Sequence, residues 1–286
     1  MAMFVKPYAH LAARLVTIWL GAIGLTAGFA TVPSWAADEP RAWLGYRTGD
    51  RFTEPAISRH VAKNIYAFSF VSRYKYGTNF IAVDFLESDK NDPISGGGGG
   101  AQEVYGVYRH TLSLGQILDT KIALGPIGDV GLTIGFDRNS KNDPVSPRVR
   151  KSVIGPSVIF DTPGFFSLSI LLRQERNHNG IVGTSVVFDD TWGMSLDWDM
   201  PVHLWNASFD GFIDYIAAKG KDGFGADTAP ETVARTYLMF DIGHFFGKKR
   251  TFYAGAGYEY WKNKFGVASG PGNQTHAPML ALRAYL

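Results

Sequence analysis

The chain has 286 residues, of which 28 are basic and 26 acidic, and it contains no cysteine. The lack of cysteine excludes disulfides and thiolate metal sites. The near-balance of charge, with no basic block, argues against a nucleic-acid polymer as a partner.

The first 36 residues have the features of a cleaved signal peptide. Lys6 and Arg14 form a basic region, residues 15–30 are apolar, and Ser34-Trp35-Ala36 fits the small-x-small cleavage pattern. A membrane anchor is the alternative, but several glycines interrupt the apolar stretch. Cleavage after Ala36 removes both basic residues of this region, so the mature part (37–286) has 26 basic and 26 acidic residues.

Segments of alternating apolar and polar residues occupy much of the mature chain. In order, they cover residues 42–46, 64–71, 79–88, 103–114, 130–137, 149–160, 166–173, 191–200, 206–215, 235–242, 252–261 and 278–286. Successive side chains of a strand point to opposite faces, so each segment predicts a strand with one apolar and one polar face. About twelve such strands predict an all-β fold, an antiparallel transmembrane barrel of the bacterial outer-membrane type.

The region from Thr191 to Tyr215 shows this pattern most clearly. Its first half places five large apolar residues on one face, namely Trp192, Met194, Leu196, Trp198 and Met200. Asp197 and Asp199 take the opposite face, and the alternation resumes after Pro201. The pattern predicts a hairpin that is apolar towards lipid and charged towards an interior.

The connections are predicted to alternate between long polar loops and short turns along the whole chain. Residues 88–100, 176–190, 218–231 and 262–276 form long loops, and the connection over residues 115–128 has no clear assignment. Short turns lie on the periplasmic side of outer-membrane barrels, so both chain ends are expected there. A soluble sandwich is the alternative, but strands of about ten residues exceed the ~5–6 typical of soluble sheets.

Several segments resemble the nucleoside-specific outer-membrane channels, the Tsx-type porins. They are YKYGTNF (74–80), SDKNDP (88–93), GAQEVYGVYRH (100–110), GFDRNSKND (135–143), KGKDGFGADTAPET (219–232) and GKKRTFYAGAGYEYWKNKFG (247–266). The resemblance implies a monomeric barrel for passive uptake of nucleosides and deoxynucleosides. Such barrels commonly end in Phe, whereas this chain ends in Ala284-Tyr285-Leu286. Expected partners are nucleosides, outer-membrane lipids, and the export and barrel-assembly machinery of the periplasm.

A nucleoside is a flat aromatic base on a neutral sugar, so its channel needs aromatic faces and hydrogen-bonding groups. The predicted lumen residues that supply both are Glu103, Tyr105, Arg109, Asp137, Phe212, Asp214, Arg235, Glu259, Trp261 and Arg283. Any single charge among them is explained as well by salt-bridged scaffolding. The mixed-sign lining as a whole suits a neutral polar solute better than phosphate or a cation.

A lipid-modifying barrel enzyme is the alternative function. His110 and Ser113 are the nearest candidates for a catalytic pair, but their opposite parity points them to opposite faces. The glycine run at 96–100 lacks the βαβ context of a dinucleotide site, and the histidines lack metal-ligand spacing. We therefore expect a channel that has no catalytic residue, cofactor or metal.

Overall fold

The structure is a computed structural model that describes residues 40–92, 98–122, 124–143, 146–181, 183–203 and 206–286. The proposed signal peptide lies outside these residues. The elements are β1 (Arg41–Phe52), β2 (Val61–Tyr74), β3 (Gly77–Ser88), β4 (Gln102–Ser113), α2 (Leu114–Ile117), β5 (Ile127–Lys141), β6 (Arg148–Phe160), β7 (Phe165–Asn179), β8 (Thr184–Val187), β9 (Thr191–Val202), β10 (Ala207–Ile216), β11 (Glu231–Asp241), η2 (Ile242–Phe246), β12 (Phe252–Lys262), η3 (Lys264–Gly266) and β13 (Gln274–Tyr285).

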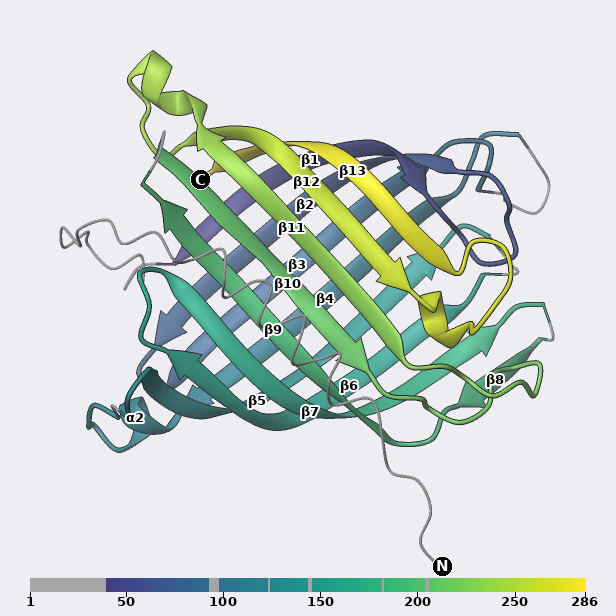
Figure 1. Cartoon of the computed structure of the whole chain (residues 1–286), viewed down its shortest axis with the longest axis horizontal. Coiled ribbons are helices and arrows are strands. Elements are labelled where there is room, and N and C mark those ends of the chain that lie inside the picture. Colours follow the sequence, from purple (N-terminus) through teal and green to yellow (C-terminus); the bar gives the residue numbers. More distant parts are fainter. Residues whose placement is uncertain (1–39, 93–97, 123, 144–145, 182, 204–205) are drawn as a thin grey trace, which may run out of the picture. The chain divides into compact units, whose positions relative to one another are not determined.

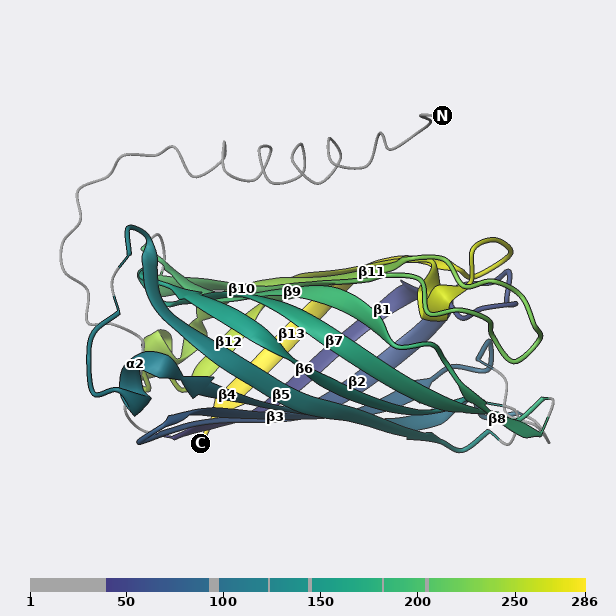
Figure 2. The same cartoon turned by 90° about the horizontal axis from the view of Figure 1, so that it is seen from below.

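All of these strands except β8 form one closed antiparallel barrel of twelve strands (Figures 1 and 2). The sheet runs from β6 through β1 to β13 and on to β7, and the pairing of β6 with β7 closes it. The predicted fold class is therefore confirmed. Closure pairs the backbone groups of every barrel strand on both sides, as a sheet in lipid requires.

The alternating pattern of β9 and β10 is realised in their pairing. Leu196 lies opposite Ile213, and Asp197 lies opposite Phe212. The apolar partners point away from the interior, whereas Asp197 accepts a hydrogen bond from Ser195, which also bonds to Asp214 inside the barrel. The facing predicted for this hairpin is confirmed.

The barrel exterior is apolar over many strands. Ile170 on β7 is 53% exposed and Leu280 on β13 is 69% exposed, and Leu44, Phe85 and Trp192 are similarly open on three further strands. A soluble protein rarely exposes contiguous apolar surface of this extent. The exterior is therefore suited to lipid contact, and the soluble sandwich is excluded.

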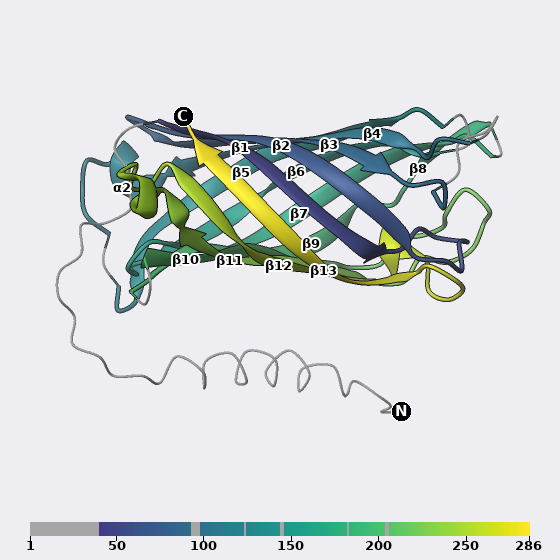
Figure 3. The same ribbon diagram turned by 90° about the horizontal axis from the view of Figure 1, so that it is seen from above.

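The first and last strands lie side by side (Figure 3). Trp43 pairs with Tyr285, and the amide of Leu286 donates to the carbonyl of Ala42. Strands β1 and β13 therefore meet at one rim, which we call the short-turn rim because the tight turns at 75–76 and 161–164 also lie there. The opposite end is the long-loop rim. By the rule for such barrels, the short-turn rim faces the periplasm.

The strict alternation of long and short connections was a wrong prediction. At the short-turn rim, the β4–β5 connection (114–126) and the β11–β12 connection (242–251) are both longer than the β5–β6 connection (142–147) at the other rim. Side chains hold both in place. The Ser113 hydroxyl caps α2 by accepting from the amide of Gln116, and the amide of Arg250 donates to Asp241 at 2.8 Å.

Two strand predictions also need correction. β1 is much longer than the predicted 42–46, because it pairs with both β2 and β13 through Gly45 and continues with β2 through Gly49, two positions where the apolar alternation is interrupted. Part of the loop predicted over 176–190 is extended chain. β7 continues to Asn179, and the β-branched residues of β8 pair with it.

Candidate functional site: the barrel lumen

A contact that crosses the barrel identifies the lumen face. The guanidinium of Arg235 on β11 lies 3.4 Å from the carboxylate of Asp84 on β3. These strands are not neighbours in the sheet, and they lie on opposite walls (Figure 2). The contact therefore passes through the interior, and residues that share the parity of Arg235 or Asp84 on their strands face the lumen.

Four charged side chains of alternating sign meet at this contact, and we call them the central network (Arg47, Asp84, Arg235 and Glu259). Arg47 donates to Asp84 from Nη1 at 3.1 Å and from Nη2 at 2.5 Å. Arg235 donates from Nε to Glu259 at 2.9 Å. Hydrogen bonds between ionised partners are strong and geometrically specific. The two guanidinium groups and two carboxylates balance in charge.

A second ion pair lies along the wall formed by β4 and β5. Arg109 donates from Nη1 to Asp137 at 2.6 Å, and the Tyr105 hydroxyl donates to the other carboxylate oxygen at 3.1 Å. Gly135 makes this arrangement possible, because a Cβ there would lie 2.7 Å from Cδ of Arg109. The arginine can therefore lie flat against the wall.

A third group joins β7, β9 and β10. A guanidinium nitrogen of Arg173 lies 3.7 Å from Asp214, and the Ser195 hydroxyl bonds to the same carboxylate at 2.5 Å. Gly193 lies directly beneath the arginine, since a Cβ at this position would clash with Nε of Arg173. Phe212, on the same face of β10, lies under the guanidinium of Arg235, 5.6 Å from its ring centroid.

Aromatic rings and one ion pair line the lumen near the short-turn rim. Arg283 donates to both carboxylate oxygens of Asp210, at 3.2 and 2.9 Å. The ring centroid of Tyr285 lies 5.6 Å from that of Trp43 and 5.4 Å from that of Tyr253. Trp43 and Tyr253 were not predicted as lumen residues, because they lie near strand ends, where few alternating residues remain to assign a face.

An ion-paired cluster fixes the loops at the long-loop rim. The ammonium groups of Lys63 and Lys264 lie 2.5 and 3.2 Å from one carboxylate oxygen of Glu54. Lys264 also donates to the carbonyl of Thr53 at 2.7 Å. Burial acts to raise the pKa of Glu54, but the positive charges of Lys264 and Lys63 outweigh it and hold that pKa well below its usual range.

The ten predicted lumen residues all have the inward parity, but they do not form one compact site. Besides those already described, Glu103 accepts from Asn139 at 2.7 Å, and Trp261 donates to Glu231 at 2.7 Å, both towards the long-loop rim. Arg283 lies towards the other end. Their part in solute binding stays a prediction.

Sequence reasoning did not single out Asp84 or Arg47, which are central in the structure. The alternation of Ile81, Val83 and Phe85 with Asp84 does assign Asp84 to the inner face. Parity gives the face of a residue, however, and not its partner across the barrel. The pairing with Arg235 was therefore not accessible from the pattern.

One side of the lumen is filled with apolar side chains, and we call it the packed side (the inward residues of β11, β12, β13, β1 and β2 that form two buried clusters). The clusters are Phe52, Val61, Ile65, Ala277 and Met279, and Met239, Tyr253 and Ala281. Ile65 is 1% exposed although it faces the interior of a barrel. This part of the interior is a buried apolar core, and the buried charges of Arg47, Lys63 and Glu259 lie on the same strands.

Two parts of the lumen wall keep access to solvent, and we call them together the open side (the inward residues of β3, β4, β9 and β10). Their side chains are mostly half-buried, including Phe80, Tyr105, Asp197 and Phe212. The inward residues of β5, β6 and β7 between them, such as Val153, Ser157 and Leu171, are buried. Arg235 reaches over the open side from β11. The open side is thus the region where a solute would meet aromatic and charged groups together.

The candidate catalytic pair is separated by the wall of the barrel. Nδ1 of His110 lies 3.0 Å from the side-chain oxygen of Asn79, and its Nε2 lies 3.2 Å from the hydroxyl of Tyr74. Ser113 is buried and donates to Asp129. The two residues therefore cannot act on one substrate as the triad logic requires.

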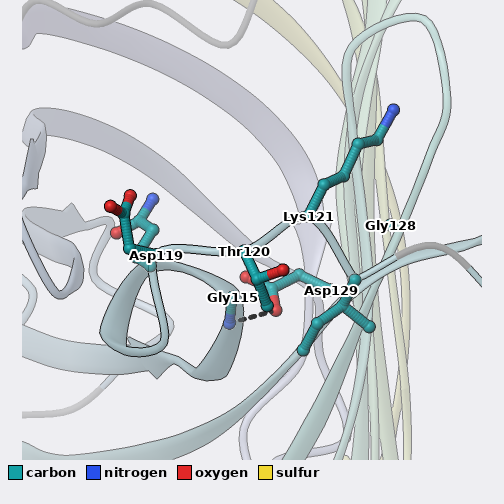
Figure 4. Close-up of a pocket in the computed structure, with 8 residues that line it drawn as sticks. Gly115, Asp119, Thr120, Lys121, Gly128 and Asp129 are labelled. Atoms are coloured by element: carbon teal, nitrogen blue, oxygen red, sulfur yellow. Dashed lines mark hydrogen bonds between the residues drawn. The ribbon is translucent and has the colours of Figure 1, made fainter.

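A pocket of about 350 Å³ lies in the β4–β5 connection beside α2 (Figure 4). Its acidic group, Asp129, already accepts from the hydroxyl of Ser113 and from the amide of Gly115 at 3.0 Å. Lys121 extends away from Asp129 in the close-up. The hydrogen bonds of Asp129 serve to hold the connection, and the pocket is separate from the central network.

Within the residues that the structure describes, no helix is both long and apolar enough to cross a membrane. Over the same residues, no group of three or more His, Cys, Asp or Glu side chains could hold a metal ion.

No known family description matches the chain, and no curated protein does either. Among solved structures, it is similar to a KdgM porin (TM-score 0.42, 9% identity, 85% of this chain and 98% of the other). It is also similar to the translocator domain of autotransporter NalP from Neisseria meningitidis (0.38, 12%, 96% and 95%) and to the TodX monoaromatic hydrocarbon channel (0.36, 10%, 88% and 91%). At such values these likenesses say nothing about solutes. None of the three is described as a nucleoside channel, so that resemblance stays a prediction.

The class of the protein follows from its own structure. A closed antiparallel barrel of twelve strands combines an apolar exterior with a lumen that carries charged and aromatic groups. Such a barrel is the form in which a sheet crosses lipid, and an even strand number is characteristic of bacterial outer membranes. The chain is an outer-membrane β-barrel.

Proposed function

We propose that this barrel is a passive channel for small neutral solutes that carry a flat ring, with nucleosides and deoxynucleosides as the class that fits best. The observation that carries the proposal is the charge pairing of the lumen. Arg47, Arg109, Arg235 and Arg283 each lie against a carboxylate. A lining whose charges are satisfied offers little net attraction to a phosphate or a metal cation.

Aromatic groups on the open side supply the second requirement. Tyr105 and Phe212 face the lumen from β4 and β10, next to charged groups that can accept or donate hydrogen bonds. Stacking of a base on one ring is worth roughly 1–3 kcal/mol. One or two such contacts give dissociation constants near the millimolar range, since 1 mM corresponds to about −4.1 kcal/mol. Binding of this strength speeds entry without preventing exit.

Conductance of the purified protein in planar bilayers tests the proposal. We expect nucleosides to reduce the ion current reversibly at millimolar concentration, while free ribose and nucleoside monophosphates have a smaller effect. Equal block by all three, or none by nucleosides, would contradict the proposed selectivity. Liposome swelling with the same solutes gives an independent measurement of passage.

A further inference from the structure

The lumen of this barrel is not uniform around its circumference. The packed side contributes a buried apolar core, whereas the open side carries half-buried polar and aromatic groups. One polar contact connects the opposite walls at this place, the approach of Arg235 to Asp84 at 3.4 Å. The passage for a solute therefore lies between two buried parts of the wall, the packed side and the inward residues of β5–β7, and this contact stands beside or across it.

We propose that Asp84 and Arg235 form a cross-bore bridge that sets the size limit of the passage along the open side. The inference rests on the proposed channel function, and it names Asp84 as a specificity-determining residue. Both side chains keep contact with solvent, since Arg235 is 21% and Asp84 is 17% exposed. They are therefore not sealed inside the core that adjoins them.

Each end of the bridge is held on its own wall by another charge. Glu259 on the neighbouring strand β12 fixes Arg235 through contacts at 2.9 and 2.8 Å. Arg47 on β1 fixes Asp84 through two hydrogen bonds. Because the anchoring bonds are shorter than the 3.4 Å contact between Arg235 and Asp84, the cross-bore contact is the weakest connection of the central network.

The other arginines of the middle of the barrel behave differently. Arg109 pairs with Asp137 on the adjacent strand, above Gly135. Arg173 lies over Gly193 and reaches Asp214 past a single intervening strand. These side chains contact partners on their own part of the wall. Asp84 and Arg235 are the pair in the described part of the chain that links β3 to β11 through the interior.

The test compares the single-channel conductance and the solute size limit of the Asp84→Ala and Asp84→Asn variants with those of the unchanged protein. Removal of the carboxylate in Asp84→Ala should raise the single-channel conductance in KCl about twofold, because the narrowest section dominates the resistance of a pore. In liposome swelling, it should admit a disaccharide that the unchanged protein excludes. Asp84→Asn keeps the volume of the side chain but removes its negative charge. It should therefore shift the ion selectivity towards anions, with a smaller increase in the solute size limit than Asp84→Ala.

A pair of alanine-to-cysteine variants tests the placement of the passage along the open side without replacing either residue of the bridge, and the chain contains no other cysteine. Ala82 lies on the open side two residues before Asp84, and Ala281 lies on the packed side where it pairs with Arg47. A charged methanethiosulfonate reagent should modify Ala82→Cys and reduce its conductance. Ala281→Cys should stay unmodified.

These outcomes separate the two proposals. Equal reagent access at positions 82 and 281 overturns the placement of the passage along the open side, and Asp84→Ala conductance equal to that of the unchanged protein overturns the bridge. Both measurements use ions alone, so they hold even where nucleosides prove to be the wrong solute. If Asp84→Ala fails to fold, as shown by loss of the heat-modifiable band on electrophoresis, Asp84→Asn and the cysteine pair decide the matter.

Discussion

The packed side and the open side of the lumen follow the same alternation rule and have opposite properties. On β2 and β13, the inward positions carry Ile65, Ala277 and Met279, which form a buried cluster. On β4 and β10, the inward positions carry Tyr105, Arg109 and Asp214, which keep contact with solvent. The comparison teaches that an inward position in a barrel is not necessarily a pore position. Part of the interior serves as the core that a soluble domain would have.

The largest effect is expected from substitutions that test which face of a strand points to lipid and which to the lumen. Leu196→Arg places a charge on the lipid face of β9, which costs about 2–4 kcal/mol near the bilayer midplane. We expect no assembled barrel in the outer-membrane fraction. The adjacent Asp197→Ala, on the lumen face, should assemble normally and change permeation alone. Reversal of the two results would show that the inner and outer faces are exchanged.

The next largest effect is expected at the long-loop rim, where the ion-paired cluster of Glu54 lies at the end of the packed side. Glu54→Gln leaves the ammonium groups of Lys63 and Lys264 buried without their carboxylate. Breaking a buried pair in this way costs about 3–5 kcal/mol. The variant should convert from the heat-modifiable folded band to the unfolded band at a lower temperature. Lys221→Gln, which disrupts an exposed ion pair with Asp227, is the control and should change little.

The Glu54 carboxylate also makes the stability of the barrel depend on pH. Because the pKa of Glu54 is lower in the folded protein than the usual value, its contribution to stability is complete above the ordinary pKa of about 4.3. That contribution decreases as the pH falls through the lowered pKa of the folded state. Midpoints of unfolding recorded from pH 7 to pH 3 should therefore fall less steeply for Glu54→Gln than for the unchanged protein.

The core character of the packed side can be measured directly. Ile65→Ala should destabilise the barrel by about 2–5 kcal/mol, the range for removing a large side chain from a close-packed interior. The matched pair is Val61→Ala on the packed side and Val107→Ala on the inward face of β4, which remove the same atoms. Val107→Ala should cost less, because Val107 is half-buried whereas Val61 is fully buried. Similar losses in chemical denaturation would mean that the two sides are packed alike.

The smallest effect is expected on solute binding at the open side. Phe212→Ala should weaken the block of current by nucleosides by roughly 1–3 kcal/mol, or about five- to 150-fold, through loss of a stacking face. Phe212→Tyr retains the ring and should retain the block. A nucleoside affinity that is unchanged in Phe212→Ala would place the stacking elsewhere in the lumen.

The sequence contains most of the barrel but little of its interior arrangement. The hairpin from Thr191 to Tyr215 could be predicted because each of its strands has one apolar and one polar face. The full length of β1 could not, because Gly45 and Gly49 interrupt its pattern and its extent depends on pairing with β2 up to Phe52 and with β13 up to Thr48. Helix α2 depends in the same way on the cap by Ser113 and the hold of Asp129, which local pattern does not show.

The candidate site shows the same limit. Alternation assigns Asp84, Arg235 and Glu259 to the inner face. It does not give their position around the circumference or their depth, and these decide which charges meet. Register between strands supplies both quantities, and it is a property of the whole closed sheet. The division into a packed and an open side follows from it.

The glycines beneath Arg109 and Arg173 allow a guanidinium to rest along the wall instead of standing towards the axis. An added methyl group at position 135 or 193 would meet both the arginine and a backbone carbonyl oxygen, that of Tyr108 at the first position and that of Tyr215 at the second. Both the strand pairing and the arginine therefore need a residue without a side chain here, so neither position can be enlarged without moving the wall of the barrel itself.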